Sequence, residues 1–394
     1  MKTRMSRLPH LAIFSFAAAV HLLLFSICPV SGRIYRTNDA VVIEVSDMVA
    51  SDLAEQIPSA RFARSNFGYP GPIPANPYTG LYYLPYPNLP FWPYPLYNKP
   101  TISSVSADVK DFAATSPDSR QQKIACGVGP ASPPQRTTPT VSIVGGSQAI
   151  PNSWPFVGLR IAGMSTAFCG GSIISTTRIL TAAHCVDKLS EFEISTMTVS
   201  LGMHTQGNGN DLKNDAQQTR RITRVVYHKD FNTKTAVNDV AVLTMDPPIN
   251  YSAAISPVCL PPASTAADQF VDKNAAIIGW GILNFPGGNQ PNELQQATVQ
   301  ITSNAKCSEF YGSLLPNPLR IFIQHICAGA AGKDVCQGDS GGPLVVRTVT
   351  GATSTWTQVG VTSFGLSCIA NPIAPSVYAS VAFFRKWIDT YMTS

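Results

Sequence analysis

The chain has 394 residues, of which 44% are hydrophobic and 13% charged, so it can bury a core and is not disordered as a whole. Its formal net charge of +5 is spread along the sequence without a run of Lys and Arg, which gives no support for nucleic-acid binding. Length and composition therefore predict a slightly basic protein with one large domain or two ordinary ones.

The first predicted element is a secretory signal peptide over residues 1–32. A basic start and an almost wholly apolar stretch over residues 11–27 are followed by small residues around Gly32, which suit a signal peptidase. Residues 8–30 are nearly long enough to span a bilayer, so an uncleaved signal anchor is the alternative. No later segment has the length and apolarity of a membrane span. We expect a secreted, extracellular protein that has no membrane attachment once the signal is removed.

Residues 33–125 differ in composition from the rest of the chain. Pro, Tyr and Asn concentrate between residues 66 and 100, and proline lacks a backbone donor and disfavours helix in the residue before it. We predict a largely irregular, disordered pro-region here, with an aromatic, proline-rich binding module as the alternative. Residues 126–142, which are also rich in proline, form a linker and activation segment.

From residue 143 onwards, short apolar runs recur between Gly, Pro, Asn and Asp. This texture predicts many short strands and hence an all-β sandwich or barrel. Only residues 382–392 have the three- and four-residue spacing of apolar side chains that is typical of an amphipathic helix. The runs that we expect to form strands lie at residues 156–161, 172–174, 197–201, 240–245, 275–279, 297–301, 343–346 and 358–362.

The chain has nine cysteines, and Cys28 would leave with the signal peptide. The remainder is an even number in a secreted chain and predicts a set of disulfides, although spacing alone does not choose among the many pairings. None of the cysteines has the C-x-x-C or Cys/His spacing of a zinc site. We expect neither a metal nor another cofactor.

Three short motifs carry residues with catalytic chemistry. His184 lies in Thr-Ala-Ala-His-Cys, Asp239 in Asn-Asp-Val-Ala-Val, and Ser340 in Gly-Asp-Ser-Gly-Gly-Pro. A serine hydroxyl is a weak nucleophile at neutral pH and needs a base in the right tautomer to take its proton. With histidine, aspartate and serine in this order, residues 143–394 resemble the trypsin and chymotrypsin family of serine proteases.

The resemblance implies two six-stranded antiparallel β-barrels with a C-terminal helix, and it implies a serine endopeptidase. Ser340 would attack the peptide carbonyl, His184 would accept and return the proton, and Asp239 would orient His184. The N–H groups of Gly338 and Ser340 would bind the oxyanion. The partners would then be a protein substrate, an activating protease and a serine protease inhibitor, and no nucleic acid.

The resemblance also implies how the cysteines pair. One pair would fix the loop that holds His184, and another would brace the pocket beside Ser340. The pair that contains Cys126 would keep the amino-terminal part attached after activation. The implied disulfides are Cys169–Cys185, Cys336–Cys368, Cys307–Cys327 and Cys126–Cys259.

The sequence Ile-Val-Gly-Gly from Ile143 onwards resembles the mature amino terminus of this family. Cleavage before Ile143 would create an α-ammonium group, and its expected partner is Asp339, so that a buried pair orders the oxyanion hole and the pocket. The residue before the cut is Ser142, where most relatives have Arg or Lys. A trypsin-like activator should not cut there. The alternatives are an activator of other specificity, cleavage elsewhere with trimming, or no activation.

Asp334 lies six residues before Ser340. In trypsin-like relatives an Asp at this place forms the base of the primary pocket and binds Arg or Lys. Ser363 and Gly365 would line the pocket, and Ser376 stands where trypsins have Gly, so its side chain would narrow the pocket or bond to Asp334. We predict cleavage after Arg or Lys. The alternatives are cleavage after aromatic or small residues and a solvated loop position for Asp334.

Further signals concern modification and competing functions. Asn250 begins an Asn-Tyr-Ser glycosylation sequon. A rival functional class is a catalytically silent homologue that acts as a binding partner, but all three triad residues are present, which favours an enzyme. A third hypothesis makes residues 33–125 an adhesive or matrix segment with the protease as cargo.

Overall fold

The computed structural model describes much of the chain from residue 125 onwards and one segment before it. The signal-peptide core, residues 48–124 and the activation site at Ser142 and Ile143 lie outside the described residues. Those described are 30–47, 125–130, 146–154, 156–160, 164, 166–206, 217–283, 288–314, 320–330, 334–350, 353–365 and 375–393.

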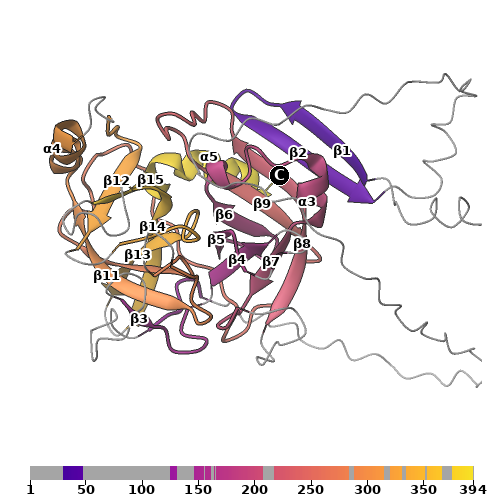
Figure 1. The fold of residues 1–394 in the computed structure, drawn as a ribbon, viewed down its shortest axis with the longest axis horizontal. Coiled ribbons are helices and arrows are strands. Elements are labelled where there is room, and N and C mark those ends of the chain that lie inside the picture. Colours follow the sequence, from indigo (N-terminus) through magenta and orange to yellow (C-terminus); the bar gives the residue numbers. More distant parts are fainter. Residues whose placement is uncertain are drawn as a thin grey trace, which may run out of the picture. The chain divides into compact units, whose positions relative to one another are not determined.

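The first barrel is a closed antiparallel sheet (Figure 1). Its strand order is β8-β7-β4-β5-β6-β9, and β9 pairs with β8 to close it. Leu159, Ile179 and Leu243 are fully buried in its core. The strands are β4 (Phe156–Arg160), β5 (Cys169–Ile173), β6 (Arg178–Thr181), β7 (Thr198–Leu201), β8 (Gln218–His228) and β9 (Ala241–Asp246).

The second barrel repeats this architecture in the order β10-β13-β14-β15-β12-β11, closed by pairing of β10 with β11. A short strand, β3 (Ser147–Gln148), joins it through β11. The expected fold of two six-stranded antiparallel barrels is therefore confirmed. The strands are β10 (Asn274–Gly279), β11 (Gln295–Thr302), β12 (His325–Gly329), β13 (Pro343–Thr350), β14 (Thr353–Phe364) and β15 (Ser376–Ser380).

The C-terminal helix α5 (Val381–Thr393) forms where its apolar spacing predicted it. It comes after the second barrel in sequence but packs on the first, since Nε of Arg178 on β6 donates to the Tyr391 carbonyl over 3.1 Å. None of the helices in the described part of the chain is long and apolar enough to cross a membrane. The others are η2 (Ala183–Cys185), α3 (Glu191–Thr196) and α4 (Asn304–Leu314).

Residues 33–47 do not form the irregular chain that their place in the pro-region suggested. β1 (Val30–Arg36) and β2 (Ala40–Asp47) form an antiparallel hairpin, drawn in indigo in Figure 1. Residues 40–44 of β2 pair with residues 224–228 of β8, so the hairpin extends the sheet of the first barrel. The apolar, mostly β-branched residues of β2 explain this, because such side chains suit a buried sheet.

Three disulfides link described residues, and they are among the pairs that the resemblance implied. Cys336 is also disulfide-bonded, and its expected partner, Cys368, lies outside the described residues. The three disulfides between described residues are Cys126–Cys259, Cys169–Cys185 and Cys307–Cys327.

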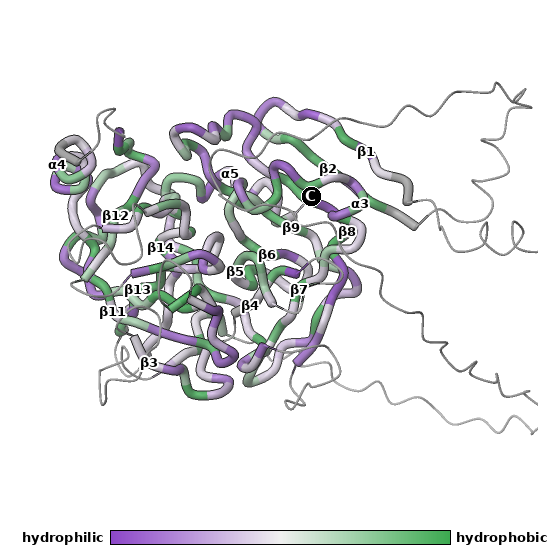
Figure 2. Tube along the Cα trace, viewed as in Figure 1, coloured by the Kyte–Doolittle hydropathy of each residue, from purple (hydrophilic) through white to green (hydrophobic). Residues whose placement is uncertain are grey.

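Figure 2 shows hydrophobic stretches along the strands of both barrels, whereas α4 is mostly hydrophilic.

Candidate active site

His184 and Asp239 meet because their strands pair. His184 lies in η2, directly after β6, and Asp239 precedes β9. The last residue of β6, Thr181, pairs with the first residue of β9, Ala241, so the two strand ends lie side by side. Nδ1 of His184 lies 2.7 Å from Oδ2 of Asp239, and the His184 backbone N–H donates to Oδ1 over 2.9 Å. The carboxylate thus fixes both the ring and the backbone of the histidine.

Asp239 also bonds across to the second barrel. The Ser363 hydroxyl, at the end of β14, donates to Oδ2 of Asp239 over 2.5 Å. Asp239 is only 1% exposed, and although burial alone would raise its pKa, its ion pair with His184 and its hydrogen bonds hold the pKa below the ordinary value. For His184, burial would lower the pKa, but the charge and hydrogen bond of Asp239 outweigh it and raise the pKa.

Ser340 lies on the turn that precedes β13, and backbone hydrogen bonds hold this turn on both sides. Gly341 N–H donates to the Thr362 carbonyl and Thr362 N–H donates to the Gly342 carbonyl, each over 2.9 Å. From the first barrel, the N–H of Gly170 on β5 donates to the Ser340 carbonyl over 2.7 Å. The turn is therefore attached to both barrels at the serine.

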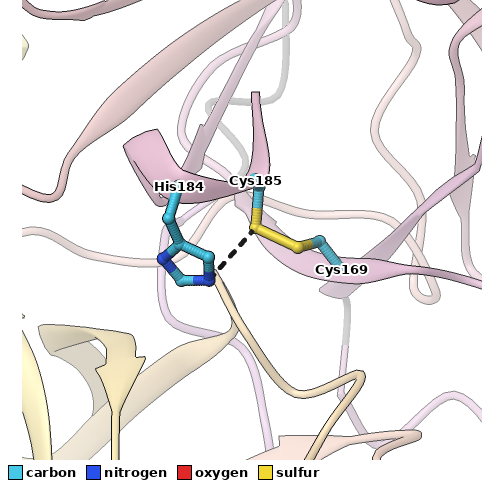
Figure 3. Close-up of side chains that lie close together, drawn as sticks. All are labelled: Cys169, His184 and Cys185. Atoms are coloured by element: carbon cyan, nitrogen blue, oxygen red, sulfur yellow. Dashed lines mark hydrogen bonds between the residues drawn. A yellow bond between two sulfur atoms is a disulfide. The ribbon is translucent and has the colours of Figure 1, made fainter. Parts of the chain in front are cut away.

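A disulfide connects this contact to the histidine. Cys169, next to Gly170 on β5, is bonded to Cys185, next to His184 (Figure 3). Sγ of Cys185 lies 3.9 Å from Nε2 of His184, the ring nitrogen that does not face Asp239. Cys169, His184 and Cys185 have donor atoms close enough to suggest a metal site. Both sulfur atoms are in the disulfide, however, so neither can serve as a thiolate ligand.

Gly338 and Ser340 present backbone N–H groups on the same turn. In the described part of the chain, neither N–H donates to a protein acceptor. Gly338 has a φ of 100°, which a residue with a Cβ rarely adopts. A Cβ here would also lie 2.3 Å from Nε2 of Gln290. Glycine therefore permits both the backbone conformation and the close approach of Gln290.

Asp339, which points away from solvent between these two residues, is 2% exposed. Its Oδ1 accepts the N–H of Gly281 over 2.7 Å, and its Oδ2 accepts the N–H of Cys336 over 2.9 Å. Burial raises its pKa to about 6 because desolvation penalises the charged form. No cation pairs with this carboxylate among the residues that the structure describes.

Asp334 lies beside Ser376, the first residue of β15. The Ser376 hydroxyl donates to Oδ1 of Asp334, and the N–H of Val335 donates to the same oxygen over 2.8 Å. Burial raises the pKa of Asp334 to about 6. A Cβ on Gly365 would lie 2.9 Å from Oγ of Ser376, so the serine side chain fills space next to Gly365. Of the two effects expected for Ser376, the geometry contains the bond to Asp334, and the narrowing of the pocket stays a prediction.

The family model described as Trypsin matches residues 143–388, which is more than half of the chain. The chain belongs to the trypsin family of serine proteases. Among curated proteins, the proclotting enzyme of Tachypleus tridentatus is 32% identical over 263 residues, which cover 65% of this chain and 67% of that protein. The trypsin-family match begins at residue 143, so the hairpin of β1 and β2 lies wholly outside it. The match ends inside α5.

Two residues near the trypsin-family site carried no signal in the sequence. Gln290, which abuts Gly338, donates from Nε2 to the Ala167 carbonyl over 3.0 Å. His325, on β12, is 3% exposed, and its Nε2 lies 3.4 Å from the carbonyl of Ala236, in the segment that leads to Asp239. Neither lies in a recognisable motif, because both make contacts with segments that are far away in the sequence and meet them only in the folded chain. Asn250, the predicted glycosylation site, is exposed.

Proposed function

We propose that this trypsin-family protein is a secreted serine endopeptidase precursor that, once cleaved before Ile143, hydrolyses peptide bonds after Lys or Arg. The observation that carries the proposal is the hydrogen-bonded network of His184, buried Asp239 and Ser363. The turn of Ser340 is bonded to Gly170, next to the disulfide that reaches Cys185. A hydrogen-bonded carboxylate that orients a histidine next to a serine is the arrangement that acyl transfer requires.

The reaction would begin with attack of Ser340 Oγ on the substrate carbonyl carbon. Nε2 of His184 would take the hydroxyl proton, and the nearby negative charge of Asp239 would stabilise the imidazolium that forms. His184 would then return the proton to the leaving amine, which breaks the peptide bond and leaves an acyl ester on Ser340. Water would enter, give a proton to His184 and release the acid as the proton returns to Ser340.

The tetrahedral intermediate carries negative charge on the former carbonyl oxygen. The N–H groups of Gly338 and Ser340, which have no acceptor in the described part of the chain, are suited to bind that oxygen. Donors of this kind contribute most when they are already oriented before the reaction, and loss of one typically costs about 10²–10³ in rate. The bond from Gly341 of this turn to Thr362 and the bond from Gly170 to Ser340 would hold the two donors in that orientation.

Asp334 supports a preference for a cationic side chain before the cleaved bond. Its carboxylate accepts a hydrogen bond from Ser376, whose side chain lies next to Gly365, and at neutral pH, above its pKa of about 6, it carries a negative charge. A partly buried carboxylate attracts ammonium or guanidinium groups and disfavours apolar ones. Cleavage after aromatic or small residues is the alternative that a substrate profile would reveal.

Activation would give Asp339 the cation that it lacks among the described residues. A buried carboxylate held only by two backbone N–H groups is costly at neutral pH, and a new α-ammonium at Ile143 would compensate its charge. The relative's name, proclotting enzyme, indicates a precursor, and by analogy we assign a precursor role to this chain. Secretion is supported by the predicted signal and the disulfides.

The test uses a precursor in which a site-specific protease cuts directly after Ser142, so that the new chain begins at Ile143. The product is incubated with a peptide library, and Ser340→Ala is the matched control. We expect cleavage after Lys and Arg that the control lacks. Cleavage after other residues would refute the role of Asp334. No cleavage, with the new amino terminus verified by sequencing, would overturn the enzyme proposal in favour of a silent homologue.

A further inference from the structure

The hairpin of β1 and β2 precedes the activation site by about a hundred residues, yet it forms part of the first barrel's sheet. Residues 40–44 of β2 pair with β8 in antiparallel register, and Val42 lies opposite Val226. This is the geometry of β-strand addition, in which main-chain hydrogen bonds supply affinity and alternate side chains supply specificity. Both faces of β2 are covered, because Ala40, Val41, Val42 and Ile43 are all at most 4% exposed.

The tip of the hairpin bonds to the C-terminal helix. The Asp39 carbonyl accepts from Nε1 of Trp387 over 3.2 Å and from the N–H of Lys229 over 3.1 Å. Its carboxylate accepts from the hydroxyl of Tyr391 over 2.6 Å, and the hydroxyl of Thr37 lies 2.9 Å from the same Tyr391 oxygen. One short turn therefore holds two residues of α5 and the end of β8.

The first barrel covers the hairpin at further points. Helix α3 contacts both β1 and β2. On the strand pair itself, Arg224 of β8 forms an ion pair with Glu44 of β2 over 3.2 Å, and Tyr35 of β1 donates to the same carboxylate over 2.9 Å. The interface thus combines a buried apolar strand with polar contacts at its margin, as stable interfaces do.

We propose that residues 33–47, the part of the hairpin that remains after removal of the predicted signal, are a docking segment, which keeps the amino-terminal part of the chain bound to the first barrel without a covalent bond after the chain has been cut. Its binding site consists of the edge of β8 over residues 224–228, which β7 does not pair with, together with α3 and α5. The disulfide Cys126–Cys259 attaches the chain at a second point. Residues 48–124 are therefore connected to the catalytic domain at both ends, and a single cut within them would release neither end.

The test distinguishes attachment through the docking segment from attachment through the disulfide Cys126–Cys259. A recognition sequence for a site-specific protease is inserted after Pro100, and the folded precursor is cut under non-reducing conditions. Residues 33–100 contain no cysteine, so after removal of the signal no covalent bond can hold the amino-terminal fragment. We expect it to co-elute with the remainder of the protein in gel filtration at micromolar concentration, and hydrogen exchange of the amides of residues 224–228 to stay slow.

Two matched variants locate the attachment in the hairpin. Val42→Asp places a charge in the covered face of β2, whereas Ile34→Asp places the same charge on β1 at a side chain that is 56% exposed. After the cut we expect the Val42→Asp fragment to elute alone and the Ile34→Asp fragment to stay bound. Because wild-type protein folds before it is cut, its result decides the proposal even if Val42→Asp does not fold.

Separation of the wild-type fragment on gel filtration would overturn the proposal. So would equal retention of the fragments from a folded Val42→Asp variant and from Ile34→Asp, since attachment would then lie elsewhere in residues 48–100. Neither measurement uses catalysis, so the outcome is independent of the proposed protease activity.

Discussion

At the level of single residues, the two carboxylate oxygens of Asp334 differ. Oδ1 accepts two hydrogen bonds, from Ser376 and Val335, whereas Oδ2 has no donor in the described part of the chain. A guanidinium group binds best when both oxygens are open to its two parallel N–H groups, but an ammonium group needs only one acceptor. Under the role proposed for Asp334, we therefore expect a preference for Lys over Arg.

Ser376→Gly should therefore raise the ratio of kcat/KM for Arg substrates to that for Lys substrates, by about tenfold if one charge-assisted hydrogen bond is gained. The measurement compares two peptides that differ only in this residue, on protein activated at Ile143. Ser354→Ala, a small change elsewhere on the second barrel, is the control. An unchanged ratio would show that Ser376 does not limit access to the carboxylate.

At the level of secondary-structure elements, the sequence allowed the eight expected strands and α5 to be predicted, because their apolar runs are long or clearly periodic. β8 was missed because its first half is polar and its buried residues, Ile222, Val225 and Val226, do not alternate regularly, since a register shift lies between Ile222 and Arg224. β2 was missed for a different reason. Its run Ala-Val-Val-Ile-Glu-Val is typical of a strand, but the proline-rich stretch after it concealed it. Its partner, β8, lies far along the sequence and could not be inferred from local pattern.

In the candidate site, too, some residues could be predicted from local sequence and others could not. His184, Asp239 and Ser340 each lie in a recognisable motif, and so the family resemblance was enough to select them. The contacts of Gln290 and His325 arise between segments that are far apart in the sequence, and no motif marks them. The bond from Ser376 to Asp334 was one of two expected effects, because sequence gives the residue types but not the direction of a side chain.

Helix α3, which covers the hairpin, has a complete capping box at its start. The Ser190 hydroxyl accepts from the N–H of Glu193, and the Glu193 carboxylate accepts from the N–H of Ser190. Ser190→Ala should lower the free energy of unfolding by about 1 kcal/mol, as for other cap losses. Denaturant unfolding with intact disulfides measures this. Ser195→Ala, in the same helix but outside the cap, should change stability by much less.

At the level of the whole molecule, the buried carboxylate of Asp339 makes the stability of the precursor depend on pH. Its pKa is about 6 in the folded chain against an ordinary value of 3.8. A group with a raised pKa contributes stability that is present below its unfolded value and lost as the pH rises through its folded value. Asp334 acts in the same direction. The lowered pKa values of His204, His228 and His325 act in the opposite direction, so the test must isolate Asp339. Removal of its charge should raise the unfolding temperature more near about pH 8 than near about pH 5.

Thermal unfolding of the Ser340→Ala precursor, which cannot cleave itself by the proposed mechanism, measures this pH dependence. Asp339→Asn should raise the unfolding temperature more at the higher pH, whereas Asp272→Asn, at an exposed position, should have the same small effect at both. An equal effect of Asp339→Asn on the unfolding temperature at the two pH values would contradict the assignment of an uncompensated buried charge at Asp339.

Each barrel packs against one element that lies at the far end of the other barrel's sequence. β3 precedes the first barrel in sequence but pairs with β11 of the second, and α5 comes after the second barrel but packs on the first. Asp239 of one barrel is bonded to Ser363 of the other. None of the three described disulfides crosses from before residue 263 to after it. A chain divided near that point would therefore yield two halves, each of which ends in an element, β3 or α5, that packs on the other half. Such halves are suited to fragment complementation, in which recovered activity reports that they have associated.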